Sequence, residues 1–393
     1  MSGSSLRIAM VGNGATVHAL VRGSAIASLG HKVRLVTLGP VLSHEKIEVK
    51  TRPIPRTPFG GLFAFASFQR DLRSFQPDLL HVHYAGGRLG SLALASGLRP
   101  LVVTVMGGDV QPEQLMGRAT WSDHRATRRI LAEADLILSK SVALRTDIAR
   151  YGDYSNKIET VRWGIEAEQF GRDSAKGARL RARMGLRPGP ILFSPRILRR
   201  HYNVHLIIEA LPRILEKRPD ALLLVSRHRE DRDYAKELRD RIEQLGLDQS
   251  VRFIEPVVYE DMPAMLSMTD VVVSVPFSDG LPQTLFEALA SETPIVMGRL
   301  PSYGELVEDE SEVLLADLDA ASIAEKVGRV LTDPELATRL TKAGLARAKS
   351  RISLREDARR VDGFYRRVLA APRRPSPLLP RVLDAVSLGL RRA

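Results

Sequence analysis

The repeated alternation of short apolar runs with helix-like segments constrains the fold of this chain more than any other feature. In the first half the apolar runs are LRIAMVG (6–12), KVRLVTLG (32–39), DLLHVHY (78–84), PLVVTVM (100–106) and ADLILSKS (134–141). In the second half they are PILFSPR (190–196), ALLLVSR (221–227), VRFIEP (251–256), DVVVSVP (270–276) and TPIVMG (293–298). Helical patterns such as His18 to Leu29 lie between them. Apolar strands joined by helices are typical of parallel sheets covered on both faces, so we predict an α/β fold with two doubly wound sheets.

The length of 393 residues also favours two domains, because it exceeds what one ordinary hydrophobic core holds. We place the division in the polar, Gly-containing segment 164–189, with residues 1–170 in the first domain and 171–360 in the second. Ligands of open parallel sheets bind beyond the carboxyl ends of the strands. Two such domains facing each other would therefore line a cleft with both carboxyl edges.

The composition excludes several classes of protein. The chain has no cysteine, which rules out disulfides, thiolate metal sites and a cysteine nucleophile. No apolar run is long enough for a membrane-spanning helix. The start MSGSSLRIAMVG lacks the basic, apolar and cleavage regions of a signal peptide. We therefore expect a cytoplasmic protein.

The net charge of +12 is concentrated near the end of the chain. Residues 351–393 contain 11 Arg and four acidic residues, which accounts for +7 of the total. This favours an anionic surface or anionic substrate over duplex DNA, and no nucleic-acid-binding signature is present. The tail at 372–393 is basic and Pro-rich, with an apolar stripe beside its arginines. It is compatible with lying on the anionic inner face of the cytoplasmic membrane, with docking on the first domain, or with disorder.

The stretch SVPFSDGLPQTLFEALASETPIV (274–296) runs from a strand through a turn into a helix. Pro282 suits the first helical position, and the amides after it would bind an anion at the positive end of the helix dipole. Gly280 permits close approach of a ligand. Asp279 ends the strand, and Glu287, about a turn and a half into the helix, can accept two hydrogen bonds from a vicinal diol. These groups together match a nucleotide attached to a sugar; the alternative is an N-capping Asp and a solvent-facing Glu.

With these residues in place, the chain resembles retaining glycosyltransferases of the GT-B fold, in particular glycosyltransferase family 4. Asp279 and Glu287 match the Glu-x(7)-Glu motif of that family, with Asp279 replacing the first Glu. The resemblance covers nearly the whole chain. It is carried by LRIAMVGNG with GHKVRLVT, by ADLILSKSVALRTDI, by KIETVRWGIEAEQF and by SPRILRRHYNVHLIIEALPRILEKRPDALLLV.

The resemblance implies a specific domain arrangement. Residues 1–170 would form an acceptor-binding Rossmann-like domain, and 171–360 a Rossmann-like domain that binds a nucleotide-sugar donor, facing it across a cleft. The segment ARRVDGFYRRVL is similar to the family's last helix, so residues 361–371 would cross back to the first domain.

The resemblance also implies which residues hold the donor. Asp279 and the backbone of Gly280, Leu281 and Pro282 would hold its sugar and phosphates, and Glu287 its ribose.

Arg196 matches an Arg that pairs with the donor phosphates, where a bidentate contact stabilises the leaving diphosphate. The alternative is an arginine that only extends from a strand end. The family's Lys five positions later is absent here, so Arg199, Arg200 or His201 would substitute for it.

Two further positions are implied to contact the donor. Ile254 falls where the family's strand end contacts the base through its backbone, although it also reads as a core residue. Gly14 lies in a loop that reaches over the donor phosphate, although a purely structural turn is the alternative. The stretch GNGATV has Val17 in place of the third Gly of a dinucleotide fingerprint, which disfavours a nicotinamide cofactor.

The acceptor side is implied to contain Asp109, in a Gly-x-Asp loop. The preceding position, often His in the family, is Met106 here. His18 and His83 are candidates to replace that imidazole, or else structural histidines. These residues are too widely spaced in the sequence to indicate a metal site, and we predict none.

We therefore predict a retaining glycosyltransferase without metal or other cofactor. It would move a sugar from a nucleotide-diphosphate donor to a hydroxyl of a glycan or lipid-linked acceptor, in glycan, polysaccharide or glycolipid biosynthesis. The alternatives are a nucleotide-sugar epimerase on the same fold and a non-catalytic scaffold of a glycan-assembly complex. The residues leave open the donor base and sugar, the acceptor and linkage, and the oligomeric state.

Overall fold

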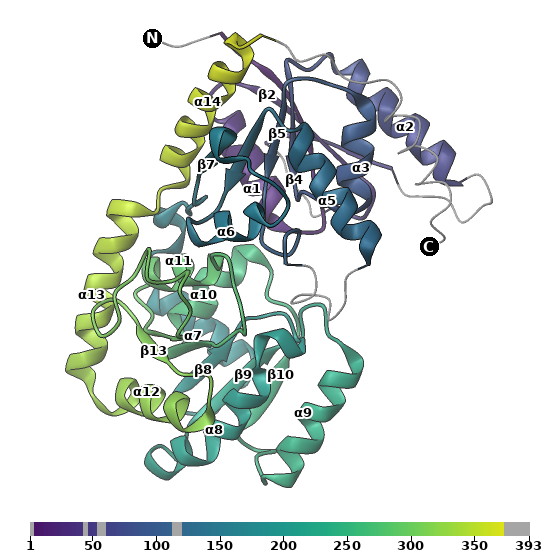
Figure 1. Ribbon diagram of the computed structural model, residues 1–393. Helices are drawn as coiled ribbons and strands as arrows, with labels where there is room; N and C mark the ends of the chain where they lie inside the picture. Colours follow the sequence, from purple (N-terminus) through teal and green to yellow (C-terminus); the bar gives the residue numbers. More distant parts are fainter. Residues whose placement is uncertain (1–3, 42–45, 53–59, 112–119, 373–393) are drawn as a thin grey trace. The chain divides into compact units, whose positions relative to one another are not determined.

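The computed structural model describes residues 4–41, 46–52, 60–111 and 120–372 (Figure 1). The chain forms two compact units. Unit 1 comprises Met1–Trp163 and Leu354–Ala393, and unit 2 comprises Gly164–Ser353.

Unit 1 contains a seven-stranded, fully parallel sheet in the order β3-β2-β1-β4-β5-β6-β7. Its strands are β1 (Arg7–Val11), β2 (Lys32–Thr37), β3 (Glu48–Thr51), β4 (Leu79–His83), β5 (Leu101–Thr104), β6 (Leu136–Ser139) and β7 (Ile158–Thr160). The strand order reverses between β1 and β4, because β1 leads outward to β2 and β4 leads to β5 on the other side. Such a switch point is where open α/β sheets bind ligands.

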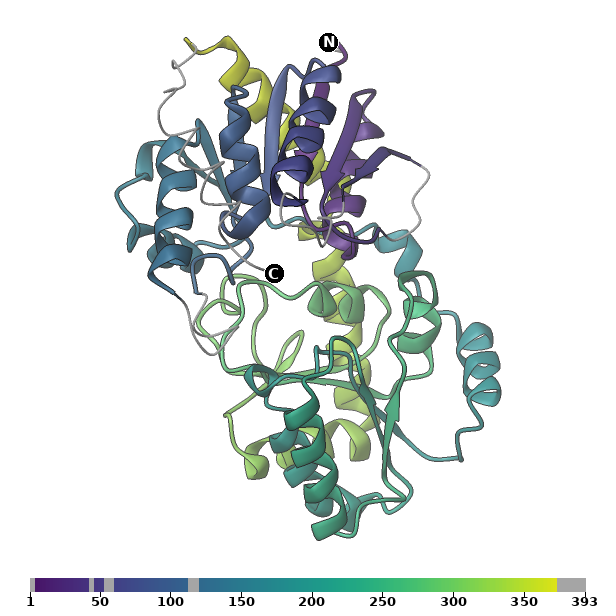
Figure 2. The same cartoon turned by 90° about the vertical axis from the view of Figure 1, so that its right-hand side faces the viewer.

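Helices cover both faces of the unit 1 sheet (Figures 1 and 2). They are α1 (Val17–Ala27), α2 (Gly60–Ser74), α3 (Gly87–Ser96), α5 (Trp121–Glu133), α6 (Ala143–Ala149) and α14 (Leu354–Ala370), with the short 3-10 helix η1 (Ser155–Lys157). Helices α1 and α14 share a core with one set of alternating strand residues, and α2, α3, α5 and α6 share a core with the other set. The sheet is thus doubly wound.

Unit 2 contains a six-stranded parallel sheet in the order β10-β9-β8-β11-β12-β13. Its strands are β8 (Ile191–Ser194), β9 (Leu222–Ser226), β10 (Val251–Ile254), β11 (Val271–Ser274), β12 (Ile295–Gly298) and β13 (Leu314–Ala316). The switch point lies between β8 and β11. The order is that of the dinucleotide-binding Rossmann sheet.

The helices of unit 2 also form two layers. The elements are η2 (Ala167–Phe170), α7 (Ser174–Arg183), η3 (Arg200–Tyr202), α8 (Val204–Lys217), α9 (Arg232–Gln244), η4 (Tyr259–Asp261), α10 (Met262–Ser267), α11 (Gln283–Ala290), α12 (Ala320–Thr332) and α13 (Pro334–Arg351). Helices α7, α10, α11 and α13 share one core with alternating strand residues. Helices α8 and α12 pack against each other, and α12 also packs on β11 and β12.

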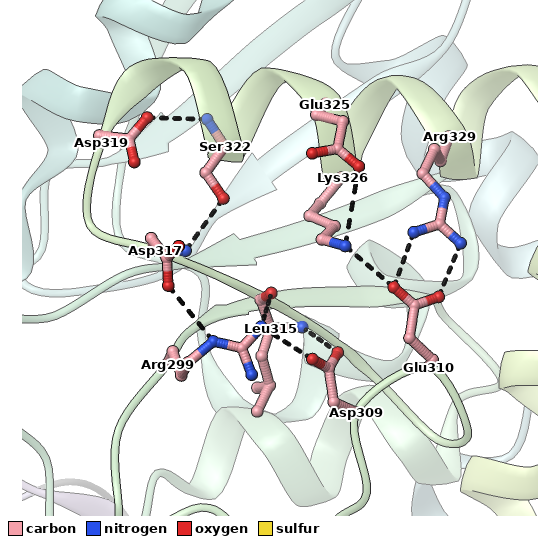
Figure 3. Close-up of polar contacts among 10 residues, drawn as sticks. All are labelled: Arg299, Asp309, Glu310, Leu315, Asp317, Asp319, Ser322, Glu325, Lys326 and Arg329. Carbon is pink, nitrogen blue, oxygen red and sulfur yellow. Dashed lines mark hydrogen bonds and ion pairs between the residues drawn. The ribbon is translucent and has the colours of Figure 1, made fainter.

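A polar network surrounds the start of α12 and the edge strand β13 (Figure 3). Asp319 caps α12 by accepting a hydrogen bond of 2.8 Å from the Ser322 amide. Glu310 accepts hydrogen bonds of 2.7 and 2.6 Å from Arg329 and one of 2.9 Å from Lys326. The hydrogen bonds from Arg329 are the main cause that lowers the pKa of Glu310 to about 2. These contacts tie the loop before β13 to the helix that follows the strand.

The ten strands predicted from apolar runs are all present, and the predicted α/β class with two doubly wound sheets is confirmed. The structure adds three short strands, β3, β7 and β13, and each lies at the edge of its sheet. An edge strand has a neighbour on one side only, so it needs no long apolar run. The exposed pattern of EVKT in β3 illustrates this.

The unit boundaries fall earlier than the expected positions after residues 170 and 360. Trp163 is fully buried in the core of unit 1. The next residue, Gly164, packs so closely on unit 2 that a Cβ there would lie 2.6 Å from the backbone carbon of Ile352. The chain therefore changes unit between these two residues.

The returning helix also begins earlier than the expected 361–371. It starts at Leu354, because Leu354 and Ala358 already belong to the core of unit 1. The tail from residue 373 onward, on which the expectation of membrane contact rests, lies outside the described residues.

Within the described part of the chain, every helix is too short or too polar to cross a membrane. The same residues contain no group of three or more His, Asp or Glu side chains placed to hold a metal ion.

Candidate active site

The carboxyl edge of the unit 2 sheet brings together two of the predicted residues. Arg196 follows β8 and Asp279 follows β11, and these two strands flank the switch point. Arg196 Nη2 donates a hydrogen bond of 2.6 Å to Asp279 Oδ2, and the side chains are only 11% and 14% exposed. The pair is thus placed where the Rossmann sheet binds ligands.

Two tyrosines enclose this ion pair. The guanidinium carbon of Arg196 lies 4.5 Å from the ring centroid of Tyr202, and the Tyr303 hydroxyl lies 3.4 Å from Asp279 Oδ2. Burial opposes the charge on Arg196, but Asp279, Tyr202 and Tyr303 outweigh it and raise the pKa of the guanidinium. Arg196 is therefore a permanent cation at this edge.

The two tyrosines were missed in the sequence. Tyr202 follows a run of basic residues and belongs to no recognisable motif, so the local sequence does not mark it as a site residue. Tyr303 follows the apolar run that became β12. Its place beyond a strand's carboxyl end was the signal that could have identified it.

The loop that carries Asp279 is held from both sides. His201 Nε2 lies 2.6 Å from the Ser278 carbonyl oxygen, and Ser302 Oγ donates a hydrogen bond of 2.8 Å to the Asp279 carbonyl oxygen. Among the three residues expected to replace the family's Lys, His201 contacts this loop.

Helix α11 begins one residue later than expected. Pro282 has extended dihedral angles (φ −77°, ψ 132°) and is the N-cap, so Gln283 is the first helical residue. Leu281 is buried in the core of unit 2, which anchors the turn after Gly280. The amides of Gln283 and Thr284 have no carbonyl of the same helix to bond to, as in any α-helix, whereas the Leu285 amide donates a hydrogen bond of 3.2 Å to the Pro282 carbonyl oxygen.

Glu287 is buried within α11 and is 6% exposed. Burial raises the pKa of Glu287 to about 7, and the charge of Arg196 opposes the rise. Among the described residues, the structure records no hydrogen-bond partner for its carboxyl group. The alternative of a solvent-facing Glu and an N-capping Asp is therefore wrong, since Glu287 is buried and Pro282 is the cap.

Arg200 lies apart from the ion pair. It forms a salt bridge with Glu237 of α9, and its guanidinium carbon lies 5.5 Å from the Tyr234 ring centroid. Both partners of this salt bridge are exposed. The structure therefore does not bring Arg200 next to Asp279.

Ile254 ends β10 and is buried in the unit 2 core. Its carbonyl oxygen accepts a hydrogen bond of 2.9 Å from the Arg227 amide. A contact with the nucleotide base at this position would share that carbonyl oxygen or use the neighbouring backbone.

In unit 1, Gly14 lies in the loop after β1. Its amide donates a hydrogen bond of 3.2 Å to Thr37 Oγ1, and a Cβ on Gly14 would lie 3.0 Å from Val41. The close packing explains the glycine by structure alone.

His18 and His83 are close enough to interact electrostatically, since His18 contributes to lowering the pKa of His83. His83 is the last residue of β4, at the switch point of the unit 1 sheet. It is buried.

Asp109 is buried, and its carboxylate accepts hydrogen bonds from the amides of Ala85 (2.7 Å), Met106 (3.0 Å) and Gly107 (2.8 Å). These bonds join the loops after β4 and β5. Its oxygens hold the two loops together, and its place on the acceptor side stays a prediction.

Two unit 1 features were not anticipated. Arg22, in the otherwise apolar helix α1, is buried and contacts His83. A single charge in an apolar helix was the signal that could have identified it. Tyr84 has φ 99° directly after β4, a strained conformation for a bulky residue that is found most often at functional sites.

Two doubly wound parallel sheets, with cationic and acidic side chains at the switch-point edge of the second, are typical of glycosyltransferases built from two Rossmann-like domains. Comparison with family models agrees with this class. Residues 12–169 match the model "Glycosyltransferase Family 4", and residues 183–347 match "Glycosyl transferases group 1". The chain belongs to this family of glycosyltransferases, and the GT-B resemblance seen in the sequence is confirmed.

Several characterised proteins are similar to the chain. Glycogen synthase from Mycobacterium tuberculosis is 26% identical over 319 residues, which cover 80% of this chain and 74% of that protein. GDP-mannose-dependent alpha-(1-6)-phosphatidylinositol monomannoside mannosyltransferase from Mycolicibacterium smegmatis is 29% identical over 265 residues, covering 65% and 67%. The crystal structure of Anabaena Alr3699/HepE in complex with UDP-glucose has a TM-score of 0.78 at 18% identity, covering 92% of this chain and 100% of that one. This last likeness shows the fold.

Proposed function

We propose that this glycosyltransferase moves a sugar from a nucleotide-diphosphate donor to an acceptor hydroxyl and retains the anomeric configuration. The observation that carries the proposal is the gathering of Arg196, Asp279 and Glu287 at the carboxyl edge of the unit 2 sheet. The interaction of Arg196 with both acids supports a shared site for one ligand.

In the proposed site each of these groups holds one part of the donor. Arg196 uses one nitrogen for Asp279, and the remaining N–H groups of its guanidinium suit phosphate oxygens. The amides of Gln283 and Thr284, the first two residues of α11, favour the same diphosphate. Glu287 accepts hydrogen bonds from the ribose hydroxyls, and Asp279 from the sugar.

The proposed reaction requires the site to stabilise a leaving diphosphate. The bond between the anomeric carbon and the diphosphate oxygen breaks, and its electron pair leaves with the phosphate. The acceptor oxygen bonds to the same face of that carbon, and its proton passes to the leaving phosphate. Arg196 offsets the charge that develops on the diphosphate. No side chain is assigned as a nucleophile, and no metal is required.

The acceptor side of the proposal rests on the charge of unit 1. Unit 1 has 31 Lys and Arg against 16 Asp and Glu, a net charge of +15, and unit 2 has 27 against 30, or −3. This asymmetry favours an anionic glycan or a lipid-linked acceptor in an anionic membrane. The name of the Mycolicibacterium smegmatis relative, a phosphatidylinositol monomannoside mannosyltransferase, supports the second choice. We propose that the protein works in the cytoplasm, at the inner face of the membrane, in glycan, polysaccharide or glycolipid biosynthesis.

The test is a thermal-shift screen of UDP-, GDP- and ADP-sugars, followed by transfer assays with the donor that binds. Glu287→Ala should abolish the shift, and Asp279→Asn should reduce turnover about 100-fold, a much larger effect than its effect on folding. Asp309 forms a salt bridge of 2.9 Å with Arg299 in the network of Figure 3. Asp309→Asn is therefore the matched control in the same unit and should leave transfer unchanged. Near-normal transfer by Glu287→Ala would refute its role.

The same experiment separates the alternatives. An epimerase would convert the donor without an acceptor, and product analysis with donor alone would reveal it. A scaffold would give no shift with any nucleotide sugar. Vesicle flotation with and without residues 372–393 tests the membrane location.

A further inference from the structure

Two histidines of β4 lie side by side on the α1 and α14 face of the unit 1 sheet. The ring centroids of His81 and His83 are 4.3 Å apart. His81 has a partner for each ring nitrogen, since the Tyr365 hydroxyl lies 2.5 Å from Nδ1 and Thr104 Oγ1 lies 2.7 Å from Nε2. His83 differs. Arg22 Nη1 lies 3.4 Å from its Nδ1, and its buried Nε2 has no hydrogen-bond partner among the residues that the structure describes.

The contact with Arg22 determines which ring nitrogen of His83 carries the proton. A guanidinium has N–H donors and no acceptor, so Nδ1 of His83 must be the acceptor in this contact. In a neutral imidazole the hydrogen then lies on the other nitrogen. His83 is therefore a hydrogen-bond donor through Nε2.

Arg22 is held firmly in this position. Its Nη1 also lies 2.9 Å from Met106 Sδ, and its guanidinium carbon lies 5.2 Å from the Trp163 ring centroid. The side chain is 2% exposed, so it cannot turn away to solvent without opening the core. The contacts with Met106, in the loop after β5, and with Trp163 thus hold in place the N–H group that faces His83.

Burial and the surrounding charges keep His83 neutral. Burial, followed by the charges on His81, Arg22 and His18, holds the pKa of His83 well below its ordinary value. The carboxylate that faces this cluster from α14 is Asp357, which acts on Arg22. A neutral imidazole whose lone pair is used by Arg22 has none left to take a proton from a substrate hydroxyl.

We propose that Arg22 is a positioning residue that locks His83 in the Nε2–H form, so that His83 gives the acceptor a hydrogen-bond donor and not a general base. The inference rests on the proposed function, in that the acceptor binds at the switch-point edge of unit 1. A buried N–H group without a partner is unfavourable, and an oxygen of the acceptor would satisfy it. His83 then orients the acceptor, while the proton of the acceptor hydroxyl goes to the leaving phosphate.

The first test is long-range proton–nitrogen NMR of the full chain labelled at histidine, with His83 assigned through the His83→Gln variant. Protonated and unprotonated ring nitrogens resonate far apart, so the spectrum reports the tautomer directly. We expect His83 to be Nε2–H and not to titrate between about pH 5.5 and 8.5. An Nδ1–H form, or titration within this range, overturns the proposal without any change to Arg22.

Variants of Arg22 test the cause. Arg22→Met keeps an apolar stem and removes the donor, so His83 should lose its single tautomer or begin to titrate. Arg22→Lys retains a donating cation and should restore the Nε2–H form. An unchanged tautomer in a folded Arg22→Met protein would show that Arg22 does not determine it.

Variants of His83 test the role in transfer. Gln can donate from near the position of Nε2, whereas the shorter Asn cannot. His83→Gln should retain transfer within about tenfold, and His83→Asn should lose about 100-fold, mainly through the acceptor KM. Equal losses of transfer in the two variants would indicate that His83 acts as a general base. If no transfer is found with any acceptor, the proposed function fails, and the NMR result still decides the tautomer.

Discussion

The carboxyl group of Glu287 is held in the interior of unit 2, and burial raises its pKa from 4.5 to about 7. The described structure offers it one nearby cation, Arg196, and no recorded hydrogen bond. A buried ionised carboxylate without hydrogen bonds destabilises a fold. Residues that destabilise a fold in this way are most often retained for function, so Glu287 is the strongest candidate for a ligand contact.

Replacement of Glu287 by Gln should stabilise the protein in a pH-dependent way. Because the folded-state pKa is raised, the stability from the protonated form is fully present below about pH 4.5 and is lost as the pH rises through about 7. Glu287→Gln should therefore increase the free energy of unfolding at pH 8, by at most about 3 kcal/mol, and change it little at pH 5. Urea denaturation at the two values measures this. A variant that is less stable than the natural chain at pH 8 would contradict it.

Nucleotide binding should depend on pH through the same residue. Ribose hydroxyls donate hydrogen bonds, so they prefer the ionised carboxylate, and affinity should rise between about pH 6 and 8. Calorimetric titration with a nucleoside diphosphate measures the effect. The 2′,3′-dideoxy form is the control, because it keeps the titrating phosphate and lacks the diol. Equal pH dependence for both ligands would exclude Glu287 as the ribose contact.

At the scale of elements, the loop before β13 is joined to α12 by the ionic network of Figure 3. Glu310 bridges Arg329 and Lys326 there, with φ 64° in a turn. All three side chains are at least partly exposed, so solvent screens the attraction. The bidentate geometry makes it stronger than an isolated surface pair.

Glu310→Gln should lower the free energy of unfolding by about 1 kcal/mol at neutral pH. Since the folded-state pKa is depressed to about 2, this contribution is present above about pH 4.5 and is lost as the pH falls through 2. It should also shrink in about 1 M NaCl. Chemical denaturation at low and high salt measures both effects. The control is Glu255→Gln, because Glu255 is largely exposed and forms a single salt bridge of 3.1 Å with Arg227. A loss that is independent of salt would argue against an ionic cause.

At the scale of the whole molecule, the two units differ in how the chain forms them. Unit 2 is one continuous segment with its own core, whereas unit 1 needs the returning helix α14. Val361 and Tyr365 of α14 are fully buried, and Asp362 Oδ1 lies 3.0 Å from His31 Nε2. Each large apolar side chain buried in this way contributes roughly 1.5–3 kcal/mol.

We therefore expect residues 164–353 to fold alone and residues 1–163 to remain unfolded or aggregate. Circular dichroism and thermal melting of the two fragments measure this. Fragment 164–353 should melt cooperatively and bind the nucleotide that the full chain binds. Cooperative melting of residues 1–163 without α14 would show that the helix is dispensable for unit 1.

Much of the fold was accessible from local patterns. The central strands such as β4 and β11 are apolar on both faces, because helices cover both, so their runs are conspicuous in the sequence. The edge strands β3 and β7 lack such runs and were missed. The turn at Asp279 and Gly280 was placed correctly, because a strand end and a helix start leave local signals.

Only part of the candidate site could be predicted from the sequence. Spacing within one segment located Asp279 and Glu287, but it could not show that Glu287 is buried or that Pro282 caps the helix. Asp109 was expected at the acceptor, and its hydrogen bonds to the loops after β4 and β5 could not be read from the sequence. Arg22 was not predicted as a site residue, because its role depends on a contact with His83 in another element.

The two parallel sheets, the turn that leads into α11 and the family could all be predicted from local sequence patterns. These depend on alternation and spacing between neighbours in the chain, which a reader of the sequence can follow. Three features became visible only in the folded chain: Arg196 contacts Asp279, Tyr365 contacts His81, and α14 completes the core of unit 1. Such contacts join residues remote in sequence. They arise when apolar faces are buried together, and the polar groups carried along with those faces must then find partners that no local pattern specifies.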